Sequence, residues 1–160
     1  MLYRDLTQLG QLIDQAVETK DIVKLDRAID RCQQVLMNHE STGYRKIVYY
    51  YLANAWSGKR RILRIGNDSW SWEQPELEKE ILNLRMALSF SEQEHTDENI
   101  SCQILTNLGN SLNYVGRSVE AVEYWNRVLE KSPDFPMAHG NRGIALCYYA
   151  GSLYDQEQSS

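Results

Sequence analysis

The sequence has no long hydrophobic run: its 160 residues contain no stretch of about 18 apolar residues, the length that a membrane-spanning helix needs. Its first residues, Met1 to Asp5, also lack the basic and then apolar pattern of a secretory signal. Hydrophobic residues at 42% and charged residues at 24% are typical of a globular domain rather than a disordered chain. We therefore expect a cytoplasmic protein that contacts no membrane.

An excess of basic residues is also missing. The chain carries 17 Lys and Arg against 22 Asp and Glu, for a net charge of −5, and the acidic excess lies entirely in residues 81–160. A nucleic-acid-binding domain usually has a basic excess or a concentrated basic stripe. The one basic cluster consists of Lys59, Arg60, Arg61 and Arg64, and we interpret it as a solvated turn. The charge pattern thus disfavours nucleic acid as a partner of this chain.

Cysteine is scarce, and its spacing excludes two kinds of site. The three cysteines, Cys32, Cys102 and Cys147, form no Cys-x-x-Cys pair, so the sequence predicts no zinc or redox motif and no disulfide framework. Each cysteine falls where a helix would bury a small apolar residue. We therefore expect three buried, reduced thiols.

Common catalytic motifs are absent as well. The sequence contains no Gly-x4-Gly-Lys-Ser/Thr loop, no His-Glu-x-x-His and no Gly-x-Ser-x-Gly. His139 has no Cys or Ser at helical spacing, and Glu76, Glu78 and Glu80 spread around a helix instead of converging. We expect no catalytic residue, no metal site and no cofactor in this chain, and therefore no enzyme.

What the sequence has instead is helical periodicity. Apolar residues at spacings of three and four, such as Leu6, Leu9 and Ile13, form single stripes along successive segments, and no segment alternates with a period of two. The pattern predicts an all-α fold of seven helices. Residues that open or close helices set the expected bounds: Asp21, Ser41 or Thr42, Pro75, Thr96 or Asp97, Ser118 and Pro136 at the starts, and Gly58, Gly116 and Pro133 at ends.

The short connections favour antiparallel helical hairpins, and the hairpins repeat. Residues 105–112 read Leu-x-x-Leu-Gly-x-x-Leu, and Ala121-x-x-x-Trp125 and Pro133 follow. Gly109 lets the two helices of this hairpin approach closely, Ala121 does the same from the second helix, and Pro133 ends the unit. Three pairs of identical residues are separated by 34 positions: Gly109 and Gly143, Asn107 and Asn141, and Leu112 and Leu146.

Over residues 102–135 these features resemble the tetratricopeptide repeat family, whose repeat has that length. Residues 136–150 resemble the first helix of another repeat, and Leu52 to Trp56 resemble the same helix with Ala53 at the small position. The resemblance implies one helical-repeat domain over residues 1–160, in which antiparallel hairpins stack as a right-handed superhelix. About three repeats would span residues 3–40, 42–91 with an insertion at 57–74, and 96–135, followed by an extra helix at 136–153.

In this family the first helix of each hairpin lines a concave groove that binds a peptide or helix of another protein. Asparagine amides can pair with the main chain of an extended peptide, and tyrosines supply apolar area with a polar tip. The alternative is that the asparagines cap or bridge neighbouring helices. The resemblance places these residues in the groove: Tyr50, Tyr51, Asn54, Gln103, Thr106, Asn107, Asn110, Asn113, Tyr114, Met137 and Asn141. Thr106 stands where a lysine would grip a C-terminal carboxylate, so we expect no carboxylate clamp.

Two other segments are candidate interfaces. Trp70 and Trp72 would face the same side of an extended segment, where they either anchor a partner or cover a hydrophobic edge. The last predicted helix lacks the second helix of its hairpin, which leaves an apolar face short of cover. The residues concerned are Ile144, Leu146, Tyr148 and Tyr149. We expect them to be covered by a partner protein, by a second copy in a homodimer through the C-terminal helix, or by further chain downstream.

We therefore expect a scaffold that binds another protein, and two alternatives stay open. One is self-association, as just described. The other rests on residues 99–155, where Gly140-Asn141-Arg142-Gly143 and Tyr148-Tyr149-Ala150 resemble the N-terminal repeat region of bacterial proteins with a C-terminal HEPN-type domain. Such domains are often ribonucleases with an Arg-x4-His motif, which this sequence lacks. That resemblance implies the regulatory N-terminal fragment of a ribonuclease toxin or defence protein.

Overall fold

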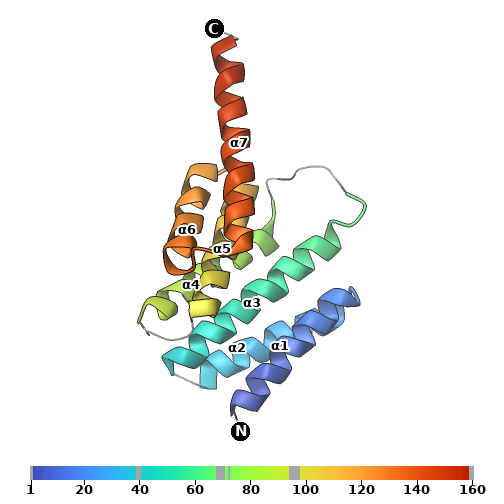
Figure 1. The fold of residues 1–160 in the computed structure, drawn as a ribbon. Coiled ribbons are helices and arrows are strands. Elements are labelled where there is room, and N and C mark those ends of the chain that lie inside the picture. Colours follow the sequence, from blue (N-terminus) through green and yellow to red (C-terminus); the bar gives the residue numbers. More distant parts are fainter. Residues whose placement is uncertain (1, 39–40, 68–70, 72, 94–97, 159–160) are drawn as a thin grey trace. The chain divides into compact units, whose positions relative to one another are not determined.

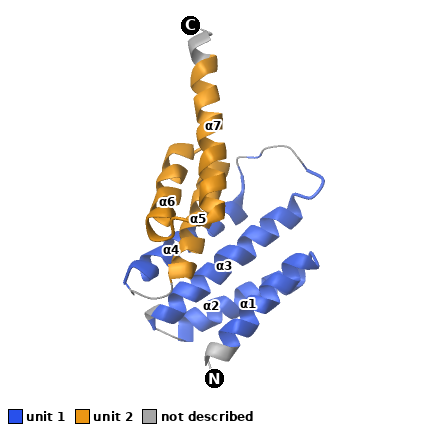
Figure 2. Ribbon diagram, viewed as in Figure 1, with its two compact units in different colours: residues 1–96 blue, residues 97–160 orange. Residues whose placement is uncertain are grey.

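The computed structural model describes residues 2–38, 41–67, 71, 73–93 and 98–158, and over these residues the chain forms seven helices and no strand. The predicted all-α fold is confirmed. The helices divide into two compact units, residues 1–96 and residues 97–160, which are described separately below (Figure 2). None of the described helices combines the length and the apolar character needed to cross a bilayer.

The first unit contains α1 (Leu2–Glu18), α2 (Ile22–Asn38), α3 (Thr42–Leu63) and α4 (Pro75–Gln93) (Figure 1). Helices α1, α2 and α3 contact one another, and α4 packs along α3, where the rings of Tyr49 and Phe90 stack with centroids 5.6 Å apart. The apolar stripes of the first three helices meet in one core. Its buried members are Leu6, Leu9, Ile13, Ala16, Leu25, Ala28, Ile29, Cys32, Val48, Leu52 and Ala55.

The predicted N-cap of α2 is confirmed. The backbone N–H of Lys24 donates to Asp21 Oδ1 at 2.9 Å, which satisfies one of the N–H groups that a helix start leaves without an intrahelical partner. This bond to the carboxylate lowers the pKa of Asp21 from its ordinary value. The cap is therefore present at neutral pH, and it is lost in acid as the pH falls through that lowered pKa.

The predicted end of α3 at Gly58 is wrong. The helix continues through Gly58 to Leu63, and Arg64 is its C-cap. Gly58 is buried, and a Cβ at this position would collide with the side chain of Val17 on α1. The glycine therefore serves a close contact between helices rather than a helix end. Residues 57–63, expected in the connection, are helical, and the connection to α4 begins at Arg64.

The second unit contains α5 (Glu98–Tyr114), α6 (Ser118–Lys131) and α7 (Pro136–Gln158). The predicted starts at Ser118 and Pro136 are confirmed, whereas the start proposed at Thr96 or Asp97 lies outside the described residues. Helix α7 is longer than expected and continues past residue 153 to Gln158.

The close approach predicted at Gly109 is confirmed. Trp125 of α6 is 1% exposed, and its ring lies against Gly109 of α5, where a Cβ would be 2.6 Å from Trp125 Nε1. The indole N–H donates to the Thr106 carbonyl at 3.4 Å, and Ala121 is fully buried one turn before the tryptophan. This contact holds α6 against α5, because no side chain larger than glycine's hydrogen leaves room for the ring.

The ends of α1 and α5 share one kind of turn. After α1, the N–H groups of Lys20 and Asp21 donate back to carbonyls of the last helical turn, and after α5 those of Gly116 and Arg117 do the same. This Schellman arrangement needs a left-handed residue, with φ +56° at Lys20 and +82° at Gly116. Glycine adopts that conformation freely, whereas the Cβ of lysine makes it costly.

We expect the substitution Lys20→Gly to stabilise the first unit by about 1 kcal/mol, because it removes the left-handed strain of a side chain. The reverse change at the matching turn, Gly116→Lys, should lower the free energy of unfolding by about 1–2 kcal/mol. Urea denaturation followed by circular dichroism measures both. Changes of the same sign in the two variants would contradict this account of the turns.

A second prediction concerns glycines inside helices. Gly109→Ala should lower the free energy of unfolding by about 1–3 kcal/mol, because the new methyl group overlaps the Trp125 ring. Gly140→Ala is the matched control, since a Cβ there meets nothing within 4 Å. The control should gain up to about 1 kcal/mol from helix propensity. Equal melting temperatures for the two variants would refute the packing described for α5 and α6.

Candidate functional site

Two stripes of side chains with the same spacing mark one surface of the second unit. On α5 the residues are Gln103, Asn107, Asn110 and Tyr114, spaced i, i+4, i+7 and i+11, which places them on one helix face. On α7 the residues 34 positions after these four have the same spacing and also share one helix face. These are Met137, Asn141, Ile144 and Tyr148. We call these eight residues together the amide face.

A hydrogen bond joins the two stripes. Asn141 Nδ2 on α7 donates to Asn110 Oδ1 on α5 at 2.7 Å, so both stripes border the same surface. The bond uses one of the two N–H groups of Asn141 and one lone pair of Asn110, and an asparagine amide has further donors and acceptors. Met137, Ile144 and Tyr148 are more than half exposed around these amides. The amide face contains no charged residue.

The bridging role considered for the asparagines is therefore present on this surface. Asn110 and Asn141 bridge two helices directly. Asn113 lies off the amide face, where Ser118 Oγ donates to Asn113 Oδ1 at 2.8 Å across the turn between α5 and α6. Gln103 Nε2 donates to Asn99 Oδ1 at 3.2 Å along α5. Of these amides, Asn113 has the clearest structural function, because its bond closes the hairpin.

The placement of Thr106 in a groove is wrong. Its side chain is fully buried, and among the described residues its hydroxyl has no hydrogen-bond partner. It lies one position before Asn107, on the face of α5 that packs rather than the face that is open. For a polar residue near the middle of an apolar helix face, the sequence carries no signal that distinguishes a buried position from a position in an open groove.

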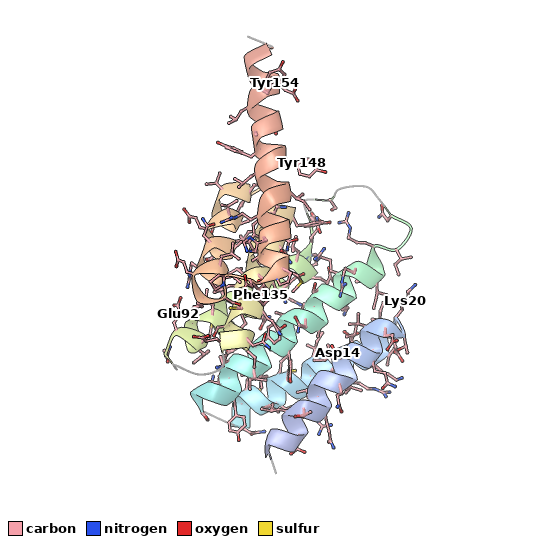
Figure 3. All side chains as sticks on the ribbon, viewed as in Figure 1. Asp14, Lys20, Glu92, Phe135, Tyr148 and Tyr154 are labelled. Atoms are coloured by element: carbon pink, nitrogen blue, oxygen red, sulfur yellow. The ribbon has the colours of Figure 1, made fainter. Side chains whose placement is uncertain are left out.

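Ile144 and Tyr148 belong to the amide face, although the sequence favoured them only as a dimer interface. The signal that finds them is the 34-residue period itself, because it maps Asn110 onto Ile144 and Tyr114 onto Tyr148. Figure 3 shows the side chain of Tyr148 extending from the α7 ribbon. Because Ile144 differs in residue type from Asn110 and Tyr148 repeats only the tyrosine of Tyr114, identity of the asparagines and glycines alone does not identify these two positions.

The remaining groove candidates lie on α3 in the first unit. Tyr50, Tyr51 and Asn54 are half-buried, and the two tyrosine rings are 6.3 Å apart. Tyr51 covers Gly10 of α1, where a Cβ would lie 2.8 Å from the phenol oxygen. Tyr51 is therefore a packing residue between α1 and α3.

The basic cluster does not form a solvated turn, because most of it lies on α3 and is paired within the first unit. Lys59 Nζ donates to Asp26 Oδ1 at 2.6 Å, and Arg60 bonds Glu80 of α4 at 3.0 Å with both side chains largely buried. Lys59 also lies 5.4 Å from the ring of Trp56. These ion pairs neutralise two of the four basic side chains in the cluster, those of Lys59 and Arg60.

The cysteines divide into two kinds. Cys32 and Cys102 are buried as expected, and burial raises the pKa of Cys32 to about 12 and also raises that of Cys102. Both therefore stay as unreactive thiols at neutral pH. Cys147 on α7 is exposed, so its predicted burial is wrong. Its helix has no neighbour on that side among the described residues of the second unit.

Of the candidate interfaces, Trp70 and Trp72 lie outside the described residues. The four predicted on the last helix are exposed: Ile144 at 57%, Leu146 at 46%, Tyr148 at 75% and Tyr149 at 46%. Tyr148 and Tyr149 also border a shallow cleft of about 510 Å³ against residues 116–120 and Glu123 of the second unit. Within the described part of the chain, no three His, Cys, Asp or Glu side chains are grouped to hold a metal ion.

Comparisons of the chain with protein-family models, with curated proteins and with solved structures gave no match.

The buried pair Arg60–Glu80 yields a stability prediction. Glu80→Ala should lower the free energy of unfolding by about 3–5 kcal/mol, because it leaves the Arg60 guanidinium buried without its carboxylate. The double variant Arg60→Met with Glu80→Leu should recover most of that loss, since it leaves no unpaired charge. Denaturant titration of the three proteins tests both statements. A double variant no more stable than Glu80→Ala would contradict them.

Proposed function

We propose that this chain is a tetratricopeptide-type scaffold that binds an extended segment of another protein on the amide face. The observation that carries the proposal is the pair of stripes on α5 and α7, which have the same spacing, a 34-residue offset and a direct bond between Asn141 and Asn110. A repeated helix that presents the same face twice produces an elongated surface suited to an extended ligand.

The architecture supports this proposal. Consecutive helices contact each other within each unit, as helical hairpins do. The hairpin of α5 and α6 has glycine, alanine and tryptophan at the positions where the repeat pattern needs small and large partners. Because α6 covers one side of α5 through Trp125, the opposite side remains available for the amide face.

The chemistry of the surface indicates the class of ligand. Three asparagines in its centre can pair with main-chain N–H and C=O groups, which every extended peptide carries regardless of sequence. Met137, Ile144 and the two tyrosines, Tyr114 and Tyr148, can contact apolar side chains of the ligand. Because the face lacks charge, it favours an uncharged segment over an acidic or C-terminal motif.

A library of displayed random peptides, selected on the purified protein, provides a ligand for the test. We expect the double variant Asn107→Ala with Tyr148→Ala to weaken a selected peptide at least tenfold, about 1.4 kcal/mol, in fluorescence anisotropy. Tyr148 is exposed, Asn107 is half-buried, and neither takes part in the Asn110–Asn141 bond, so we expect the melting temperature to fall by only a few degrees.

Asn83→Ala is the matched control, because Asn83 is an α4 surface amide that donates to the Lys79 carbonyl of its own helix. This variant should bind the peptide as tightly as wild type does. Unchanged binding by Asn107→Ala with Tyr148→Ala would overturn the proposed site. A large drop in melting temperature would instead assign these residues to the fold.

A further inference from the structure

The amide face ends at a cleft. Its two stripes finish at Tyr114 on α5 and at Tyr148 on α7. Tyr148 also borders the shallow cleft of about 510 Å³, together with Tyr149, residues 116–120 and Glu123. That volume lies within the range of about 300–1,000 Å³ that is typical of ligand sites. A ligand on the amide face can therefore reach the cleft across Tyr148.

The distance from the centre of the amide face to the cleft suits a short peptide. Asn141, which is bonded to Asn110, and Tyr148 are seven residues apart on α7. This separation is about 10.5 Å along the helix axis, since each helical residue adds about 1.5 Å. An extended peptide advances about 3.3 Å per residue, so about three residues span it. One peptide can therefore contact the asparagines and also place a side chain in the cleft.

Aromatic and apolar groups line much of the cleft. Tyr148 and Tyr149 lie on the α7 side, Val119 lies on the α6 side, and all three are exposed. The face of an aromatic ring attracts a cation, and the methylene stem of lysine or arginine packs on apolar surface. These residues therefore suit a long basic side chain.

The charges on the α6 side also favour a cation. Arg117 and Glu120 form an ion pair with each other. Glu123, about one turn further along α6, is exposed, and among the described residues it forms no ion pair or hydrogen bond. The N-terminus of a helix carries about half a positive charge, which is less than the full charge of this carboxylate. The cleft therefore has a net negative charge, and Glu123 is the group left to pair with a ligand.

Neither Arg127 nor Arg142 neutralises that carboxylate. Arg127 lies one turn from Glu123, but its guanidinium is placed 5.5 Å from the ring of Tyr124. Arg142 of α7 donates to an asparagine of α6 at 2.9 Å. Residues 97–160 carry eight Asp and Glu against four Lys and Arg, so the charge of this part of the chain also attracts a basic ligand.

We propose that the cleft binds an arginine or lysine side chain of the peptide that occupies the amide face. This inference rests on the proposed function, because it gives the same ligand a position that determines specificity. The Glu123 carboxylate pairs with the cationic head, and the rings of Tyr148 and Tyr149 contact the head and the stem. Arginine binds more tightly than lysine, since its planar guanidinium can stack on a ring and donate two N–H groups to one carboxylate.

Peptide selection on variants tests this specificity. Peptides selected on wild type should be enriched in Arg or Lys at one position, and Glu123→Gln should reduce that enrichment. Glu130→Gln is the matched control, because Glu130 is exposed on the same face of α6, two turns away from Glu123. It should select the same basic position as wild type. Wild-type peptides without a basic position, or with an acidic residue enriched there, would overturn the inference and leave the proposed function intact.

A double-mutant cycle tests the contact itself. In one selected peptide the arginine is replaced by citrulline, which keeps its shape and removes its charge. Wild type should bind the arginine peptide about tenfold more tightly, the combined effect of an ion pair and a cation–π contact. Glu123→Gln should reduce this preference to about threefold, because only the ring contact remains. Glu130→Gln should keep the full preference, and an equally full preference in Glu123→Gln would refute the contact.

Two further arms separate this inference from the proposed function. Asn107→Ala lies outside the cleft, so it should weaken both peptides and leave the preference for arginine unchanged. Acetyl-arginine-amide is a probe that needs no contact with the amide face. At millimolar concentration it should shift the NMR signals of the backbone amides of residues 116–123 in wild type, and acetyl-citrulline-amide should not.

The outcomes of these arms differ for the two proposals. A response of the cleft to the arginine probe, with no peptide that Asn107→Ala weakens, would support the cation site and refute the proposed function. A peptide weakened by Asn107→Ala, with no response of the cleft to the arginine probe, would support the proposed function and refute the cation site.

Discussion

The fold depends on a recurring contact in which a helical glycine lies under a side chain of the neighbouring helix. Gly109 accepts the ring of Trp125, Gly10 accepts that of Tyr51, and Gly58 accepts Val17. Each glycine weakens its own helix by roughly 1 kcal/mol relative to alanine. The gain is a closer approach of two backbones and burial of a large side chain, which offsets that loss. The contact also fixes which face of each helix is used for packing.

The candidate site is a consequence of that choice of face. Because Trp125 holds α6 against one side of α5, the side with Asn107 and Asn110 is not needed for the hairpin. The next helix in sequence reuses the pattern and brings Asn141 to Asn110. The surface that results has amides in the middle and apolar groups around them. The surface proposed to bind a ligand therefore consists of the helix faces that packing in the second unit leaves open.

Local features of this fold could be predicted from the sequence, and features that need a distant partner could not. The cap at Asp21 and the helix starts at Ser118 and Pro136 depend on residues within about one helical turn. The local sequence pattern was therefore sufficient to predict them. Gly58 was misread because a glycine looks the same whether it ends a helix or lies under Val17. The basic cluster was misread for a similar reason, since Lys59 is paired with Asp26, 33 residues earlier.

Helix α7 shows what a sequence repeat does and does not specify. The 34-residue period reproduces Gly109 as Gly143 and Leu112 as Leu146, so the surface for a covering side chain is encoded again. The cover itself is encoded elsewhere, in α6 for the first glycine and in no described residue for the second. A packing surface that is repeated without its cover keeps apolar area in contact with water, and that cost favours association with another molecule. For this reason the surface that we propose as a binding site includes residues of α7.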